Sequence, residues 1–330
     1  MRVMVTGGAG FIGSHIVDDL VASGHNVVVY DNFSTGLHDN LSAVKGSVEI
    51  VNGDILDAEK LESAMRGCDR VSHHAAQLEI FLSISRPEDD LQQNTIGTLN
   101  VLRAARKCGV EKLVNVSSAC VYGQTAEASR EDMACVPNWA YGVSKLAAEK
   151  YAQIFNDYDS LPVVSLRYAI VYGEREWYRR VLPIFLKRAL QGQAPVVFGD
   201  GLQIRDFIHV ADVVRLHRMC FEQPAALGEI FNVGRGVPVS IRELATTCCD
   251  IADQPLVPVF EETAEGDFSK LVPEKRRNSA ELKRMLLDPA KAERVLGWQP
   301  EVALDDGLRR EYVWARDNLS RWDKVRYTHA

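Results

Sequence analysis

The amino-acid sequence predicts an α/β protein with a doubly wound parallel sheet and a smaller, discontinuous C-terminal lobe. An apolar strand, the glycine turn GGAGFIG and an amphipathic helix open the chain. Strand-like and helix-like segments then alternate as far as residue 173, where the rhythm changes. We therefore expect a first domain at 1–173, to which part of 202–235 returns, and a second lobe made mainly of 174–330.

The individual elements follow from apolar spacing. Val3 and Val5 supply the buried positions of the first strand, and Ile12, Ile16 and Leu20 recur at helical spacing after it. Further strands are expected at 27–30, 49–51, 70–73, 112–116 and 163–168, with helices at 58–66, 92–107 and 141–158. In the second lobe we expect helices at 182–191, 241–251, 289–296 and 304–319.

The composition narrows the function classes. The formal net charge of −7 argues against a protein that mainly grips nucleic acid or an anionic membrane. The seven cysteines form no CxxC pair and have no metal-ligand spacing with the eight histidines, so we expect reduced thiols and no metal site. No apolar run approaches the ~20 residues of a membrane span, and the chain is expected in the cytoplasm.

The glycine turn predicts a dinucleotide site. Gly7, Gly10 and Gly13 recur every three residues between a strand and a helix, where small residues let the backbone approach a pyrophosphate. Asp31 ends the second strand, and its carboxylate accepts ribose hydroxyls but repels a 2′-phosphate, which favours NAD over NADP. Asp54 follows the third strand and is either a partner for the adenine amino group or a turn aspartate that caps the next helix.

The segment YGVSK indicates proton chemistry. Tyr141 and Lys145 are four residues apart, so they share one face of the predicted helix. An ammonium beside a phenol stabilises the phenolate, and we expect it to lower the pKa of Tyr141. Ser117 and Ser118 end the preceding strand at the edge where open parallel sheets bind ligands, so a serine hydroxyl there can hold a substrate oxygen.

A series of ordered motifs carries a resemblance to a known family. TGGAGFIG, DNFSTG, GDI, HHAAQ, NTIGTLNVL, SSACVYG, YGVSK, RYAIVYG, GDGLQIRDFIHVADVV, FNVGRG and LGWQP run in order through the chain. They resemble the extended short-chain dehydrogenase/reductases, specifically the nucleotide-sugar epimerases and dehydratases with a Rossmann-type domain. The resemblance is greatest to the UDP-glucose (hexose) 4-epimerases.

The resemblance implies NAD as the cofactor and a UDP-sugar as the substrate. Tyr141 would remove a hydroxyl proton while NAD takes the hydride, Ser118 would bond the sugar oxygen, and Lys145 would hold the nicotinamide ribose. The hydride then returns to the other face of a transient 4-keto sugar. Besides the glycines, Asp31, Asp54 and the catalytic pair, the implied cofactor contacts are Phe11, Ile12, Asn32, Ser34, Gly36, Ile55, Ala75, Gln77, Asn94 and Tyr168. Asn94 has the alternative of an internal helix asparagine, and Arg205 and Arg284 are implied as contacts of the nucleotide diphosphate.

Departures from the family pattern bear on the reaction. Ile170 stands where the epimerases usually carry an asparagine that bonds the sugar diphosphate. Dehydratases usually follow the catalytic hydroxyl with an acidic pair, whereas this chain has Ala119 and Cys120, so epimerisation is favoured over dehydration. Cys120 is either a packed core thiol or a group that exchanges protons beside a keto carbon.

The segment EREWYRR leaves the substrate open. Arg175, Arg179 and Arg180 either recognise a sugar carboxylate, which would make the substrate a UDP-hexuronic acid, or form a solvated basic loop. A dehydratase or decarboxylase of the same family is a further alternative. A regulatory protein that senses NAD without turnover is a different class, which has no need for the serine, tyrosine and lysine together.

The resemblance also implies a homodimer. The helices at 92–107 and 141–158 match those that pair across a two-fold axis into a four-helix bundle in similar enzymes. The positions expected to be partly intermolecular are Ala147, Ala148, Tyr151 and Ile154. An apolar helix face alone does not distinguish such an interface from an ordinary core.

Overall fold

The computed structural model describes residues 1–176, 180–273, 275–277 and 281–322. Its main element is a seven-stranded sheet in the order β11-β6-β5-β4-β1-β2-β3, in which every pair of neighbours is parallel. The strands are β1 (Arg2–Thr6), β2 (Asn26–Asp31), β3 (Val48–Asn52), β4 (Arg70–His73), β5 (Lys112–Ser118), β6 (Val163–Tyr168) and β11 (Ile230–Val233). The prediction of a doubly wound parallel sheet is confirmed.

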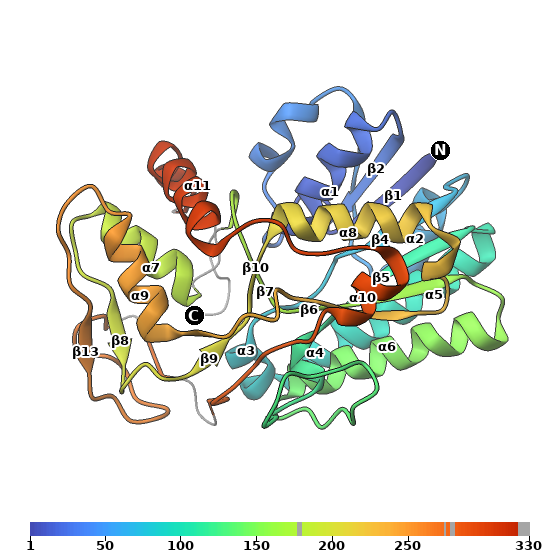
Figure 1. Cartoon of the computed structure of the whole chain (residues 1–330). Coiled ribbons are helices and arrows are strands. Elements are labelled where there is room, and N and C mark those ends of the chain that lie inside the picture. The colour runs from blue at the N-terminus through green and yellow to red at the C-terminus, as the bar shows by residue number, and fades with distance from the viewer. Residues whose placement is uncertain (177–179, 274, 278–280, 323–330) are drawn as a thin grey trace.

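Helices cover both faces of this sheet (Figure 1). Val3 and Val5 of β1 pack in one core cluster with α1 (Phe11–Ala22) and α8 (Val210–Glu222). Met4, between them, packs in a second cluster with the helices of the opposite face, which are α2 (Ala58–Met65), α5 (Gly97–Cys108) and α6 (Ala140–Tyr158). Successive strand side chains alternate between the faces, so a strand buried on both sides is apolar throughout.

The helix expected at 92–107 has a different start. A short helix α4 (Pro87–Asp90) leads into a π-helical turn, Leu91–Ile96, before α5 begins at Gly97. Apolar spacing over a few residues does not distinguish a π turn from an α turn, and such turns are frequent at functional sites. The preceding α3 (Ile80–Ser85) was not expected from the sequence.

The second lobe has its own core. Leu186, Phe207 and Leu244 are buried there together with Tyr172, which lies on the short strand that follows β6 in the chain. Its helices are α7 (Val181–Leu190), α9 (Ile241–Asp250) and α11 (Leu304–Asp317). Three small sheets pair β7 (Ile170–Tyr172) with β10 (Phe207–His209), β8 (Val196–Phe198) with β13 (Val259–Glu261), and β9 (Ile204–Arg205) with β12 (Val239–Ser240).

The remaining elements connect the two halves. Helix α8 and strand β11 belong to the large sheet and its layers although they follow second-lobe strands in the chain. Two short helices, α10 (Ala290–Leu296) and α12 (Leu319–Trp322), and 3₁₀ turns at His38–Val44, Ala119–Val121 and Pro224–Ala226 complete the described chain.

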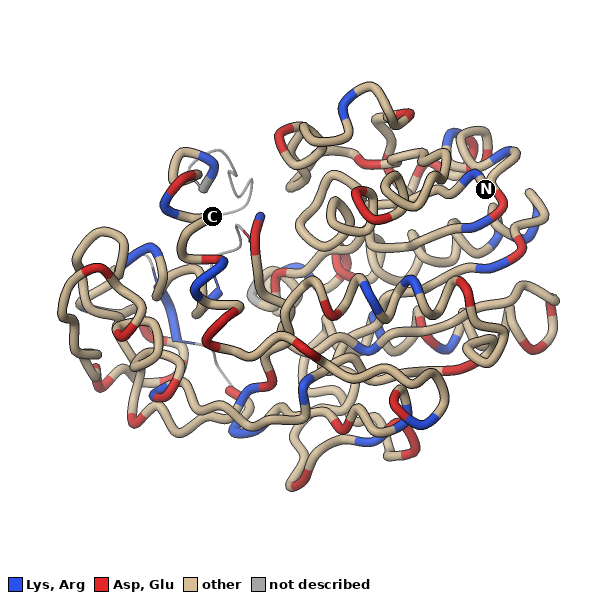
Figure 2. Tube along the Cα trace, turned by 45° about the horizontal axis from the view of Figure 1, so that its top comes forward, with Lys and Arg blue, Asp and Glu red and all other residues tan. Residues whose placement is uncertain are grey.

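The surface carries both signs of charge. In Figure 2 the basic and acidic residues are interspersed along the trace of both lobes. None of the helices described here combines the length and the apolar character needed to cross a bilayer.

Candidate active site

The ends of four parallel strands bring the predicted residues to one edge of the sheet. Gly7 follows β1, Asp31 ends β2, Ser118 ends β5 and Tyr168 ends β6. Because these strands run in the same direction, their carboxyl ends meet where an open parallel sheet binds ligands.

The glycine turn is a close-packed cradle. A Cβ atom on Gly7, whose φ is +67°, would lie 2.7 Å from the backbone nitrogen of Ala75, and one on Gly13 would lie 2.2 Å from the carbonyl oxygen of Gly7. Gly10 caps α1 without a side-chain hydrogen bond, and the first turn of α1, which includes Phe11 and Ile12, carries no acidic residue. The helix-terminal N–H groups are therefore available to an anion such as a pyrophosphate.

Backbone amides orient the carboxylate of Asp31. Its Oδ2 accepts from the amide of Ala9 at 2.9 Å, and its Oδ1 accepts from the amide of Phe33 at 2.8 Å. Gly36 packs against the same carboxylate, where an added Cβ would lie 2.8 Å from Oδ1. Burial raises the pKa of Asp31 and these two amides oppose the shift. Each oxygen keeps a further lone pair that can accept a ribose hydroxyl.

The Asp54 turn lies beside this loop. Its Oδ2 accepts from the side-chain amide of Asn32 at 2.9 Å and its Oδ1 from the amide of Leu56 at 2.9 Å. The alternative that Asp54 caps the next helix is wrong, because Asp57 caps α2. The other residues predicted near the adenosine differ in exposure. Asn32 and Ser34 are exposed, whereas the side chain of Ile55 is buried.

Tyr141 and Ser118 meet at the start of α6. Gly142 allows this approach, because a Cβ there would lie 2.4 Å from the carbonyl oxygen of Cys120. Burial raises the pKa of Tyr141, the nearby Cys120 thiol acts in the same direction, and the Arg180 guanidinium and the Ser118 hydroxyl oppose it. The expectation that Lys145 lowers this pKa is wrong for the chain by itself, because burial outweighs the nearby charges.

Lys145 is also buried, with 3% of its surface exposed. Burial lowers its pKa from 10.5 to about 8, and the carboxylates of Asp90 and Glu149 oppose this shift. Its charge in turn lowers the pKa of His74, whose burial is the larger cause. Burial therefore holds the pKa of Lys145 well below that of a solvated lysine.

A hydrogen-bond network fastens the loop after β4 to α6. The Oδ1 atom of Asn94 accepts from the amide of Gln77 at 2.8 Å, while its Nδ2 donates to the Gln77 carbonyl at 3.0 Å and to Ser144 Oγ at 3.2 Å. Asp90 Oδ1 accepts from the side-chain amides of Gln77 and Asn94, at 3.0 and 3.1 Å. Asn94 therefore positions Gln77, which follows Ala75 in the loop that closes the glycine cradle.

Asp90 is a residue of this network that was not predicted from the sequence. It lies four residues before Asn94, fully buried, and burial raises its pKa while Ser144 and Lys145 lower it. Its Oδ2 atom is buried and has no hydrogen-bond partner among the described residues. The signal in the sequence was an acidic residue at helical spacing from Asn94.

Other buried polar atoms near the strand ends also have no partner within the described chain. These atoms are Ser117 Oγ, Tyr168 Oη and His74 Nε2, which lie at or just after the ends of β5, β6 and β4. Buried polar groups are nearly always hydrogen-bonded, so such a cluster indicates a polar ligand. Together with the glycine cradle and the two remaining lone pairs of Asp31, these atoms fit a bound dinucleotide.

Two arginines from the second lobe border the site. Arg205 donates from Nη1 to the carbonyl oxygens of Ile204 and Leu282, both at 2.8 Å, and burial lowers its pKa while Glu281 opposes the shift. Its charge acts on Cys120, next to the catalytic strand end. The Nε atom of Arg284 is buried and has no partner among the described residues. Ile170, in contrast, packs against the core of the second lobe.

The arginines of the 174–180 segment have different surroundings. Arg175 is committed to α1, where its Nη2 pairs with Asp18 at 2.5 Å and its Nη1 donates to Ser14 Oγ at 3.1 Å. The guanidinium of Arg175 is thus engaged by α1 in the ligand-free chain, and substrate binding by Arg175 stays a prediction. The charge of Arg180 acts on Tyr141 and Cys120, while Arg179 lies outside the described residues.

The Cys120 thiol is buried, and this burial raises its pKa, although Ser118 and the charges of Arg180 and Arg205 oppose the shift. A neutral thiol is a poor acid and a poor nucleophile. The neighbouring Ala119 has no ionisable group. The pair after Ser118 therefore supplies no acid for the loss of a hydroxyl.

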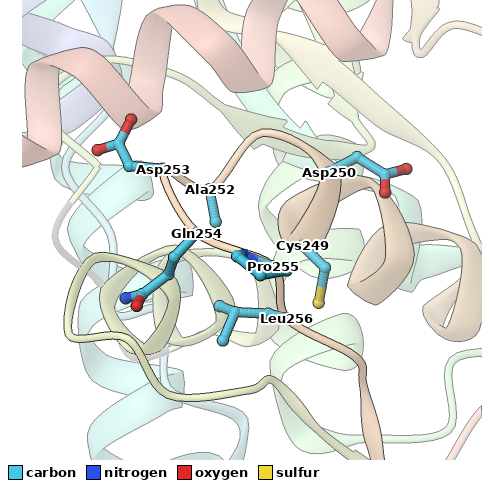
Figure 3. Close-up of a pocket in the computed structure, with 7 residues that line it drawn as sticks. All are labelled: Cys249, Asp250, Ala252, Asp253, Gln254, Pro255 and Leu256. Atoms are coloured by element: carbon cyan, nitrogen blue, oxygen red, sulfur yellow. The ribbon is translucent and has the colours of Figure 1, made fainter.

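A separate hollow lies on the second lobe after α9 (Figure 3). Its lining consists of Cys249, Asp250, Ala252, Asp253, Gln254, Pro255 and Leu256. None of these residues belongs to the strand-end site. Within the described ranges, no group of three or more potential metal ligands occurs.

Comparisons with known proteins agree with this geometry. Residues 3–234 match the model of the NAD dependent epimerase/dehydratase family. The chain is 37% identical over 325 residues to the UDP-glucose 4-epimerase of Mycolicibacterium smegmatis, a match that covers 96% of this chain and 99% of that protein.

Two solved structures are similar over nearly the whole chain. The UDP-glucose 4-epimerase of Thermotoga maritima with UDP-glucose has a TM-score of 0.86 and 33% identity, covering 97% of this chain and all of that chain. The UDP-glucuronic acid 4-epimerase of Bacillus cereus, in complex with UDP-glucuronic acid and NAD, has a TM-score of 0.85 and 29% identity, covering 96% and 99% of the two chains. The chain therefore belongs to the NAD dependent epimerase/dehydratase family of enzymes, with NAD as its cofactor.

Proposed function

We propose that this enzyme is a UDP-hexose 4-epimerase that inverts a sugar hydroxyl through a transient 4-keto sugar. The observation that carries the proposal is the meeting of Ser118 and Tyr141 at the end of β5, with Lys145 one helical turn further along α6. Epimerisation needs only these groups and NAD, because the cofactor is regenerated within each turnover.

The side chains have separate tasks in this proposal. NAD supplies the hydride acceptor and, once reduced, the hydride donor. Ser118 holds the reacting oxygen of the sugar, and Tyr141, as the phenolate, accepts its proton and returns it later. This requires the loaded enzyme, because burial keeps Tyr141 a phenol in the cofactor-free chain. Lys145, buried one helical turn from Tyr141, would hold the nicotinamide ribose and, when protonated, would supply positive charge close to the phenol.

The second lobe would bind the nucleotide. Arg205 and Arg284 border the site from two neighbouring segments, which are bridged at Ile204 and Arg284. A guanidinium suits phosphate oxygens because it presents several N–H donors in one plane. We assign the diphosphate to these two arginines.

A specific observation favours a second candidate, a UDP-hexuronic acid 4-epimerase. The charge of Arg180 reaches Tyr141, so Arg180 is a candidate partner for a carboxylate on the sugar. Dehydration is less well supported, because Ala119 and the buried Cys120 follow Ser118 where an acid would be needed.

One experiment separates these reactions. The purified protein is incubated with a panel of UDP-hexoses and UDP-hexuronic acids in deuterated water without added NAD, and products are followed by proton NMR. The proposal predicts interconversion of gluco and galacto forms with no deuterium on carbon, and the reacting member of the panel distinguishes the two candidates. Loss of water, loss of carbon dioxide or deuterium on carbon would contradict it.

We further propose that the enzyme is a homodimer. Ile154 is 48% exposed and Tyr151 is 40% exposed on α6, and Ile96 and Leu91 are exposed beside α5. Ala147 is also partly exposed, but the expectation for Ala148 is wrong, because it is 1% exposed within one chain. I154E should convert a dimer to a monomer in light scattering, and a wild-type monomer would contradict this proposal.

A cytoplasmic location is proposed from the cysteines. All seven are free, and none pairs with another in a disulfide. Unpaired cysteines are typical of a reducing compartment. Fractionation of the native host, with the enzyme followed by its activity, tests this location.

A further inference from the structure

Trp139 occupies a position where its residue type is unexpected. It is the residue that precedes α6, and it makes no side-chain capping hydrogen bond to that helix. Serine, threonine, aspartate and asparagine are preferred there because their oxygens accept helix-terminal amides, which an indole does not do. A residue that does not cap the helix it precedes is expected to have another role.

The indole is buried, and its N–H group has no partner among the described residues. Trp139 is 8% exposed, and its Nε1 atom finds no acceptor in the described part of the chain. Buried tryptophan N–H groups usually have a partner, because leaving one unpaired costs free energy. Trp298 is the ordinary case in this protein, since it is fully buried and its Nε1 donates to the carbonyl oxygen of Asp212 at 3.1 Å.

The surroundings of Trp139 indicate which ligand would supply the acceptor. It packs in a small cluster with Cys120 and Leu282, against which Tyr141 also packs. Cys120 is two residues after Ser118, which would hold the reacting hydroxyl, and Leu282 is two residues before Arg284, assigned to the diphosphate. The indole therefore packs against the catalytic Tyr141 and against neighbours in the sequence of both Ser118 and Arg284, the two groups assigned to opposite ends of the sugar.

We propose that Trp139 is a substrate-binding residue whose Nε1–H donates to an oxygen of the hexose of the bound UDP-sugar. This inference rests on the proposed function and adds the group that recognises the sugar between its reacting carbon and its phosphate. The ring also offers an apolar surface to the C–H groups of the hexose, as aromatic side chains do.

The test compares the binding of a UDP-hexose with that of UDP, which lacks the sugar. W139F keeps most of the ring and removes the N–H group, so it should weaken the UDP-hexose by about 3- to 10-fold in calorimetry and leave UDP within about twofold. W298F is the matched control, because it removes a tryptophan N–H that is already satisfied elsewhere. It should lower the thermal stability without changing the ratio of the two affinities.

Three other results of these binding measurements would contradict either the inference or the proposed function. Equal weakening of UDP and UDP-hexose would place the indole on the phosphate or the nucleotide and overturn the inference. Unchanged affinities in a folded W139F would assign Trp139 to packing alone and also overturn it. A wild-type protein that binds UDP but no UDP-hexose would instead contradict the proposed function.

A second measurement on the wild-type chain avoids dependence on one variant. The five tryptophans give five indole N–H signals in a spectrum of protein labelled with ¹⁵N-tryptophan. The Trp139 signal, assigned with W139F or with W139Y if the first variant does not fold, should shift with UDP-hexose and stay unmoved with UDP. A shift of equal size with both ligands, or none with either, would overturn the inference.

Discussion

Glu149 and Arg167 form a buried, bidentate ion pair between α6 and β6. The Nη2–Oε1 and Nε–Oε2 distances are 2.6 and 2.9 Å, and the two side chains are 0% and 2% exposed. Arg167 also donates to the hydroxyl of Tyr122 at 2.7 Å. Because Glu149 is on the helix that carries Tyr141 and Lys145, this pair fixes the helix with the proton-transfer groups to the sheet.

Removal of the charge of Glu149 should destabilise the fold strongly. In E149Q the guanidinium of Arg167 stays buried without its counter-ion, and we expect a loss of about 3–5 kcal/mol in the free energy of unfolding. Urea titration of the cofactor-free protein measures this. The control is E62Q, because Glu62 pairs with the 70% exposed Lys107 in a solvent-screened ion pair, so its loss should cost far less than that of Glu149. Equal losses in the two variants would contradict the prediction.

The buried ammonium of Lys145 should make stability depend on pH. In the folded chain its pKa is about 8, against 10.5 in the unfolded chain, so between these values the unfolded state binds more protons and stability rises with pH. Below pH 8 both states hold the proton and the burial cost is fully present.

K145M removes this titration. The free energy of unfolding of the wild type minus that of K145M should therefore increase from pH 7 to pH 9.5, by at most about 1.4 kcal/mol per pH unit. Urea titrations of both proteins at four pH values measure the difference. A difference that stays constant or falls over this range would rule out a lowered pKa for Lys145.

Tyr141 should remain a phenol in the cofactor-free chain. Burial raises its pKa above the usual 10.0, so no phenolate forms at neutral pH without a ligand. Difference absorbance at 295 nm between the wild type and Y141F should show no extra tyrosinate below pH 10. An additional phenolate with a midpoint below pH 8 would show instead that Lys145 controls this group.

The glycine turn offers two substitutions with different outcomes. In G13A the new Cβ would lie 2.2 Å from the carbonyl oxygen of Gly7, so the backbone must shift, and we expect a loss of about 1–3 kcal/mol or more. In G10A the nearest atom, the carbonyl oxygen of Gly7, is 3.2 Å from the new Cβ, so a shift of a few tenths of an ångström relieves the contact, whereas the methyl group would obstruct a pyrophosphate.

Thermal unfolding without cofactor and calorimetry with NAD separate the two effects. We expect G10A to keep its melting temperature within a few degrees and to bind NAD at least tenfold more weakly. Wild-type NAD affinity in a folded G10A would place the pyrophosphate away from this turn.

The sequence was sufficient for features that depend on near neighbours. The alternation of apolar runs and the glycine period between strand and helix are local patterns, and they predicted the parallel sheet with elements within a few residues of their observed bounds. The serine strand and YGVSK were likewise visible, because residues four apart share a helix face whatever surrounds it. The parallel direction of the strands predicted that Ser118 lies at the ligand edge of the sheet, whereas the approach of Tyr141 to it depends on the close packing of α6 at Gly142.

Other features depended on residues remote in the sequence. Arg175 pairs with Asp18, 157 positions away, whereas Arg180 acts on Tyr141, and no local pattern separated these two arginines. The π turn before α5 and the buried carboxylate of Asp90 also gave no distinctive apolar spacing.

The tertiary structure decided burial and pairing, which the sequence could not. A lysine beside a tyrosine suggested a lowered phenol pKa, but burial of both groups moves the pKa of Tyr141 upward and that of Lys145 downward. In the same way, only the packed structure separates Trp298, whose N–H is hydrogen-bonded, from Trp139, whose N–H finds no acceptor among the residues that the structure describes. Local spacing sets which residues can share a face, whereas the free energy of a charge or an N–H group depends on everything that folds around it.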